Sequence, residues 1–90
     1  MANDVESMEI VQVYQSDMEY RATDAVFEQN KEKSKVVKIT ELAQIDEILM
    51  NTSRYGYGKY VIKIKLVNGT IYFEQLDENH VPDFINKAFE

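Results

Sequence analysis

In residues 59–67, Tyr60, Ile62, Ile64 and Leu66 place apolar side chains at every second position, which is the pattern of a β-strand with one buried face. A second β-prone run follows at 70–76, and Asn68 and Gly69 stand between the two runs. An Asn-Gly pair in this position is typical of a two-residue type I′ turn, because both central residues of that turn need positive φ. The pattern therefore predicts an antiparallel hairpin over residues 59–76.

The type I′ turn also predicts the register of this hairpin. It places Leu66 opposite Ile71 and Lys63 opposite Glu74, so that the lysine and the glutamate form an ion pair on the solvent-facing side. The predicted buried face of the hairpin comprises Ile62, Ile64, Leu66, Ile71 and Phe73.

A helix is predicted near the end of the chain, over residues 80–89. Asn79 suits its N-cap, and Pro82 suits its first turn because the fixed φ of proline is helical and no N–H partner is needed there. Two shorter β-prone runs, 8–14 and 36–39, predict further strands. The predicted helix has apolar residues at helical spacing, namely Val81, Phe84, Ile85 and Ala88.

Residues 17–32 fit either a helix or a strand. The spacing of Ser16 and Glu19 matches a capping box, which favours a helix. The aromatic residues Tyr20 and Phe27 would lie off the apolar stripe of that helix, and their β-propensity favours a strand. Both alternatives stay open from the sequence.

These elements predict one α+β domain spanning residues 1–90, in which an antiparallel sheet is covered by the C-terminal helix. A hydrophobic fraction of 44% in 90 residues supplies one small core. The alternative is a smaller sheet with an additional helix at about 17–32. Residues 40–50 fit either one short helix or a turn leading into another strand.

Residues 23–28 (TDAVFE), a charged tip and residues 36–39 (VVKI) are followed by two spaced isoleucines in residues 45–48 (IDEI). This order resembles the middle of bacterial pleckstrin-homology-like domains, in which a strand carrying Thr-Asp leads through a charged hairpin to a second strand. Residues 60–73 and 84–89 resemble the late hairpin and the C-terminal helix of that family. The resemblance implies a partly open barrel, capped by a helix, that serves as a scaffold for protein contacts.

The sequence departs from the family in one respect that concerns ligands. Ala25 and Val26 stand where basic residues commonly follow the Thr-Asp pair, and the basic headgroup pocket of the eukaryotic relatives has no counterpart. The resemblance therefore does not imply phosphoinositide binding.

The charge of the chain is unevenly distributed. Its net charge is −6, yet residues 31–65 carry eight basic and four acidic side chains, while residues 1–30 carry seven acidic side chains and one basic. Such segments pair with each other inside the domain, or they form a polarised surface that steers a protein partner. The negative total disfavours nucleic acid and anionic membranes as partners.

The chain contains no cysteine, which excludes disulfides and thiolate metal sites, and no cofactor is expected. Its first residues are acidic and polar rather than those of a secretory signal, and no apolar run approaches the roughly 20 residues of a membrane span. We therefore expect a cytoplasmic protein. Because so small a core gains from added burial, a homodimer joined at an exposed strand edge is one expected form.

The candidate binding segment is the tyrosine-rich stretch 54–60. Arg54, Tyr55, Tyr57 and Lys59 combine aromatic rings with positive charge, a composition that is enriched at protein-binding hot spots. The stretch also fits a plain loop in which two glycines permit a turn.

The acidic residues Asp17, Glu19, Asp24 and Glu28 are the alternative candidate. An acidic face of this kind mimics nucleic-acid phosphates and would occupy the basic groove of a nucleic-acid enzyme, as small inhibitors from phages and mobile elements do. The same residues also fit an ordinary solvated face.

No catalytic constellation is predicted. His80 is the single histidine, and nothing in the sequence places it beside a nucleophile and an orienting acid. The acids around it lack the spacing of a calcium loop, so no metal site is expected. The sequence predicts a small protein-interaction module or regulatory protein that is not an enzyme.

Overall fold

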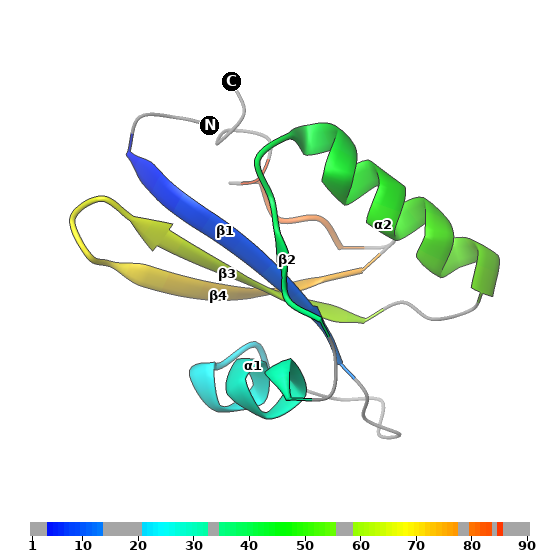
Figure 1. Cartoon of the computed structure of the whole chain (residues 1–90), viewed down its shortest axis with the longest axis horizontal. Helices are drawn as coiled ribbons and strands as arrows, with labels where there is room; N and C mark the ends of the chain where they lie inside the picture. Colours follow the sequence, from blue (N-terminus) through cyan, green and yellow to red (C-terminus); the bar gives the residue numbers. More distant parts are fainter. Residues whose placement is uncertain are drawn as a thin grey trace.

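Four strands form one open antiparallel sheet in the order β2-β1-β3-β4 in the computed structural model (Figure 1). The structure describes residues 4–13, 21–32, 35–55, 59–77, 80–83 and 85, with the backbone alone for residues 51–55. The prediction of an α+β fold is confirmed, because two helices accompany this sheet. The elements are β1 (Val5–Gln12), α1 (Asp24–Lys31), β2 (Val37–Lys38), α2 (Leu42–Tyr55), β3 (Tyr60–Leu66) and β4 (Ile71–Leu76).

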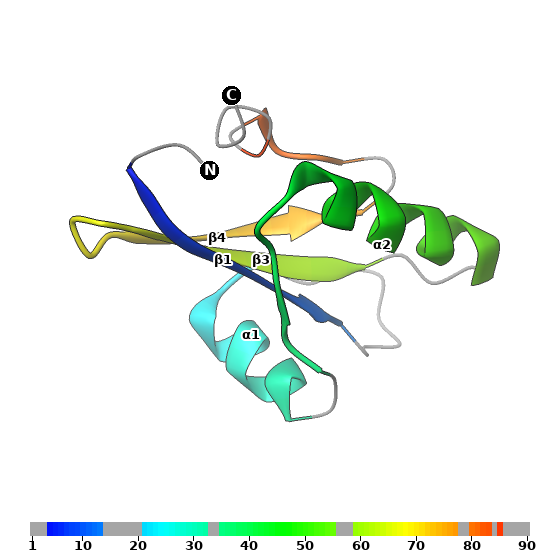
Figure 2. The same ribbon diagram turned by 45° about the horizontal axis from the view of Figure 1, so that its top comes forward.

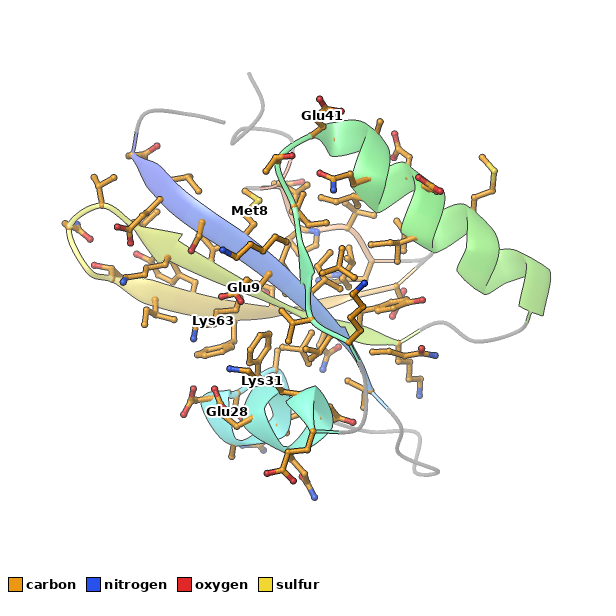
Figure 3. The ribbon with its side chains drawn as sticks, in the orientation of Figure 1. Met8, Glu9, Glu28, Lys31, Glu41 and Lys63 are labelled. Atoms are coloured by element: carbon orange, nitrogen blue, oxygen red, sulfur yellow. The ribbon has the colours of Figure 1, made fainter. Side chains whose placement is uncertain are left out.

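The sheet is covered on both faces, and each helix covers one of them (Figure 2). Successive residues of a strand point to opposite faces, so Met8 of β1 faces α2 while Glu9 faces α1 (Figure 3). The buried cluster on the α2 side contains Met8, Ile10, Ile39, Ile45, Ile62, Ile64, Leu76 and Ile85. The buried cluster on the α1 side contains Val11, Val13, Phe27 and Val61.

The segment that fits either a helix or a strand contains helix α1 in its described part. The Thr23 side chain accepts a hydrogen bond from the Val26 N–H (3.3 Å), which makes Thr23 the N-cap in place of the predicted capping box further upstream. Phe27, predicted to lie off the apolar stripe, is fully buried against Val11 and Val61. The additional helix is therefore the correct alternative for residues 24–31, and the strand implied at 23–28 by the family resemblance is wrong.

Helix α2 resolves the second ambiguous segment, and it is longer than the predicted short helix. The Gln44 side-chain oxygen accepts hydrogen bonds from the Thr40 N–H (2.7 Å) and the Glu41 N–H (2.8 Å). Gln44 is the third residue of the helix, and its side chain bonds back to the N–H groups of the two residues that precede the helix. This is one of the two hydrogen bonds of a capping box. Ile45 then anchors the helix on the sheet, where it is buried.

The hairpin of β3 and β4 is confirmed, but its predicted register is wrong by one residue. Lys65, not Leu66, lies opposite Ile71, and the loop has three residues rather than two. The Gly69 N–H donates to the Leu66 carbonyl oxygen (3.0 Å), and the Leu66 N–H donates to the Thr70 carbonyl oxygen (2.8 Å). Only glycine has positive φ among the described residues, and Gly69 has φ +93°. This is a type I turn closed by a left-handed glycine, not a type I′ turn.

The change of register inverts the two faces of β4 and removes the predicted ion pair. Lys63 lies opposite Phe73, and Glu74 lies opposite Ile62 and is exposed. Phe73 packs on the α1 side, 5.9 Å from the ring of Phe27, instead of joining Ile62 on the other face. Ile71, predicted to be buried, is exposed.

The C-terminal helix predicted over residues 80–89 lies largely outside the described residues. In the part that is described, the Ile85 N–H donates to the Pro82 carbonyl oxygen (3.1 Å), and Ile85 is fully buried on the α2 side of the sheet. This short segment therefore contributes one core residue beside β3 and β4.

Candidate functional site

The tyrosine-rich candidate segment lies at the junction of α2 and β3. Arg54 and Tyr55 lie in the last turn of α2, where the sequence predicts a loop. Lys59 directly precedes β3 and is half-buried, and its carbonyl oxygen accepts a hydrogen bond from the Val13 N–H (2.9 Å). Tyr57 lies outside the described residues, so a surface built from all four side chains stays a prediction.

The acidic candidate face is described in part. Asp24 and Glu28 lie one turn apart on α1, and both are exposed, whereas Asp17 and Glu19 lie outside the described residues. Lys31 lies on the same helix, one turn beyond Glu28 (Figure 3). The described part of this surface therefore carries both signs of charge.

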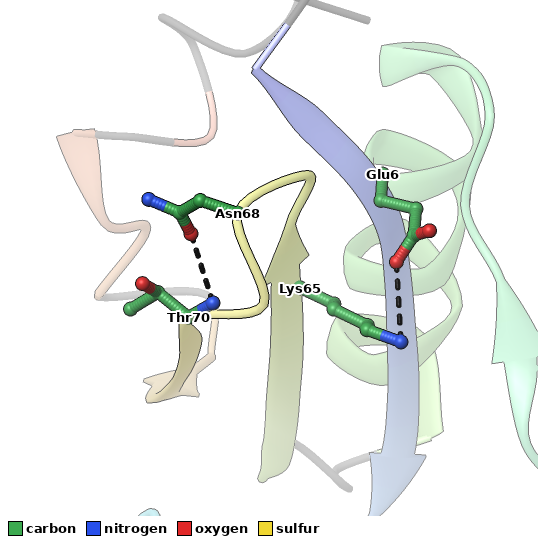
Figure 4. A network of polar contacts seen from close by, with 4 residues as sticks. All are labelled: Glu6, Lys65, Asn68 and Thr70. Carbon is green, nitrogen blue, oxygen red and sulfur yellow. Dashed lines mark hydrogen bonds and ion pairs between the residues drawn. The ribbon is translucent and has the colours of Figure 1, made fainter.

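Charged side chains of alternating sign cross the α1 side of the sheet. Glu9 of β1 lies directly opposite Lys38 of β2 and Lys63 of β3. The Lys63 ammonium lies 5.3 Å from the centre of the Phe27 ring, within the range of a cation–π contact. Near the hairpin end, the exposed side chains of Glu6 and Lys65 form an ion pair at 3.2 Å (Figure 4). These alternating charges favour pairing within the domain over a polarised surface here.

Large apolar side chains are exposed where the hairpin meets the outer strand of the sheet. Ile71 and Tyr72, the first two residues of β4, are 43% and 52% exposed. Val67, in the adjoining turn, is 64% exposed. In the described part of the chain, β4 pairs with β3 on one side and with no strand on the other (Figure 1).

The backbone of β4 has hydrogen-bonding groups directed to this outer side. In an antiparallel pair, residues alternate between those that bond to the neighbouring strand and those that do not. Thr70 accepts from Leu66, so Thr70 and Tyr72 bond toward β3. The N–H and C=O groups of Ile71 and Phe73 therefore point away from β3. We call the outer side of β4 at Ile71, Tyr72 and Phe73 the β4 edge.

Within its own six residues, β4 lacks the sequence features that usually protect an outer strand from pairing. Such strands commonly carry lysine or proline, contain a bulge, or are very short. The six residues of β4 contain no lysine, arginine or proline and one charged residue, Glu74. At the opposite edge, β2 has two residues, which offers a partner little to pair with. The composition of β4 is visible in the sequence, but its position at an edge is not.

The turn beside the β4 edge is held by its own hydrogen bonds. The Asn68 side-chain oxygen accepts from the Thr70 N–H (2.9 Å), and Figure 4 shows this contact at the tip of the hairpin. The Leu66 backbone also bonds to Gly69 and to Thr70. These bonds hold the turn, so β4 begins in an extended conformation.

Within the described residues, no group of three or more His, Asp or Glu side chains could hold a metal ion. His80 is exposed, and its backbone forms an isolated bridge with Asp77 through two hydrogen bonds of 3.1 Å. No helix among the described residues is long and apolar enough to cross a membrane.

No protein-family model, no curated protein and no solved structure matches this chain.

Proposed function

We propose that this chain is a small protein-interaction module that binds an extended segment of a partner protein along the β4 edge. The observation that carries the proposal is that three consecutive residues combine exposed apolar side chains, on Ile71 and Tyr72, with outward-directed backbone groups, on Ile71 and Phe73. A strand added to such an edge gains affinity from main-chain hydrogen bonds and specificity from alternate side chains.

The arrangement of the helices supports this proposal. Helix α1 packs mainly on β1 and β3, and its described contact with β4 is between the rings of Phe27 and Phe73. An incoming strand at the β4 edge would therefore extend the sheet beside α1. Apolar side chains of the partner could then cover Ile71 on one face and Tyr72 on the other.

We also propose that the protein binds its partner in the cytoplasm and does not act as an enzyme. A chain without cysteine supports an intracellular setting, and the single histidine, His80, is exposed in the structure. The pleckstrin-homology-like resemblance stays a prediction. The hairpin of β3 and β4 supports it, whereas α1 stands where that family has a strand.

The test is an affinity purification from the native host with two matched lysine variants. Tyr72→Lys places a charge on the β4 edge. Val67→Lys is the control, because it places the same charge in the adjoining turn at a side chain that is more exposed than Tyr72. We expect the wild-type chain and Val67→Lys to retain one partner in saturable amounts. Tyr72→Lys should weaken that complex about fivefold or more, since truncating an anchor residue costs over about 1 kcal/mol.

Equal affinity of all three proteins for the partner would contradict the proposal, provided that their circular dichroism spectra agree. The alternative function, an acidic inhibitor of a nucleic-acid enzyme, has its own signature. A complex between an acidic face and a basic groove weakens steeply with added salt, whereas strand pairing depends weakly on salt. A recurrent basic nuclease or polymerase whose binding is salt-sensitive and unaffected by Tyr72→Lys would establish that alternative.

A further inference from the structure

We propose that a second copy of this chain occupies the β4 edge, so that two sheets join as one through an antiparallel pair of β4 strands. This inference rests on the proposed function and names the partner at the same site. It starts from the backbone: the groups of Ile71 and Phe73 that point away from β3 are available to an antiparallel strand of the same sequence.

A two-fold axis at Tyr72 gives a register in which every cross-strand pair near the axis is apolar or aromatic. Ile71 of each copy then lies opposite Phe73 of the other, and their N–H and C=O groups bond reciprocally on both sides of the axis. The two Tyr72 rings meet at the axis as a non-hydrogen-bonded pair, in which side chains approach most closely. Aromatic pairs and aromatic–β-branched pairs are the favourable cross-strand combinations in antiparallel sheets.

A register with its axis at Glu74 is less favourable. An axis at Glu74 would place the two carboxylates directly opposite each other, and like charges in that position are destabilising. The axis at Tyr72 instead places Glu74 opposite Thr70 of the second copy, four residues from the other glutamate along the strand. The apolar composition of the edge, its exposure and the position of Glu74 are therefore all compatible with an axis at Tyr72.

The joined sheet is compatible with the helices. In the paired arrangement α1 of both copies lies on one face and α2 on the other, because an axis perpendicular to the sheet keeps each face on its own side. Each α1 packs on β1 and β3, away from the axis. The strands would follow the order β2-β1-β3-β4 in one copy and the reverse in the second.

The interface is small, and we expect a correspondingly weak dimer. Stable interfaces usually involve about 20–30 residues from each partner, far more than one short strand supplies. The dissociation constant should therefore be on the order of 10–100 µM. Because each copy carries a net charge of −6, added salt should strengthen the dimer by screening their repulsion.

The test is sedimentation equilibrium of the purified chain and two variants at one position. Ile71→Pro removes an outward-directed N–H, and proline is tolerated at the first residue of an edge strand. Ile71→Ala shortens the same side chain but keeps the N–H. We expect a concentration-dependent dimer for the wild-type chain and for Ile71→Ala, and a dissociation constant at least about tenfold higher for Ile71→Pro than for Ile71→Ala.

A wild-type chain that stays monomeric well above the expected dissociation constant would overturn the second copy as occupant. A dimer that Ile71→Pro leaves intact, with an unchanged circular dichroism spectrum, would overturn the β4 edge as its interface. Failure of the dimer is separate from failure of the proposed function. A monomer whose captured partner is lost in Ile71→Pro but kept in Ile71→Ala retains the binding edge and refutes only self-association.

Discussion

At the scale of single residues, the sign of φ at Asn68 decides the hairpin. A two-residue type I′ loop and a three-residue loop with a left-handed glycine both use an Asn-Gly pair. The first needs positive φ at Asn68, whereas the structure has positive φ at Gly69 among the described residues. The dipeptide alone predicts the hairpin correctly but cannot distinguish the two registers. That single difference exposes Ile71, which the type I′ register would bury and on which the β4 edge depends.

The turn gives a prediction for Gly69. A Cβ added at this position meets no atom within 4 Å, so Gly69→Ala creates no clash and isolates the cost of the left-handed backbone. We expect it to lower the free energy of unfolding by about 1–2 kcal/mol. Gly69→Asn should lose less, because asparagine tolerates this conformation better. Urea unfolding of dilute protein measures both, and an Ala variant as stable as the wild type would refute the turn.

At the scale of elements, long-range packing determines whether the segment around Phe27 is a helix or a strand, which the sequence left open. The aromatic residue Phe27 raises the β-propensity of its segment, yet it is buried as a helical residue under the sheet against Val11 and Val61. Local propensity is a weak guide in such a segment, because the burial of one large side chain outweighs it. Helix α2 was recognisable from its spacing, but its length was not.

The start of α2 gives a prediction for Gln44. Its side-chain oxygen satisfies the N–H groups of Thr40 and Glu41, so Gln44→Ala should destabilise the protein by about 0.5–2 kcal/mol. Gln44→Glu keeps an acceptor at the positive end of the helix dipole but loses the side-chain N–H that donates to the Lys38 carbonyl oxygen (3.2 Å), so it should lose less stability than Gln44→Ala. Thermal and urea unfolding of both variants provide the measurement. Equal losses in the two variants would mean that the cap is not what stabilises this helix.

At the scale of the whole molecule, the sequence predicts the α+β class and the hairpin but not which strand lies at the edge. Strand order depends on contacts between segments far apart in the chain, such as Met8 with Ile64, and no local pattern records them. Composition alone indicates the predicted candidate residues, which are Arg54, Tyr55, Tyr57 and Lys59 and the acidic set. The sequence does not predict the β4 edge, because the exposure of Ile71 depends on the register and the outer position of β4 depends on the strand order.

Amide hydrogen exchange in β4 tests whether this edge is where the molecule binds. The Tyr72 amide faces β3 and serves as the internal reference, whereas the Ile71 and Phe73 amides face outward. In dilute protein, we expect the Tyr72 amide to exchange slowly and the other two quickly. On association, with a second copy or with another partner, the Ile71 and Phe73 amides should become protected. Unchanged rapid exchange of these two amides in the associated state would show that binding takes place elsewhere on the molecule.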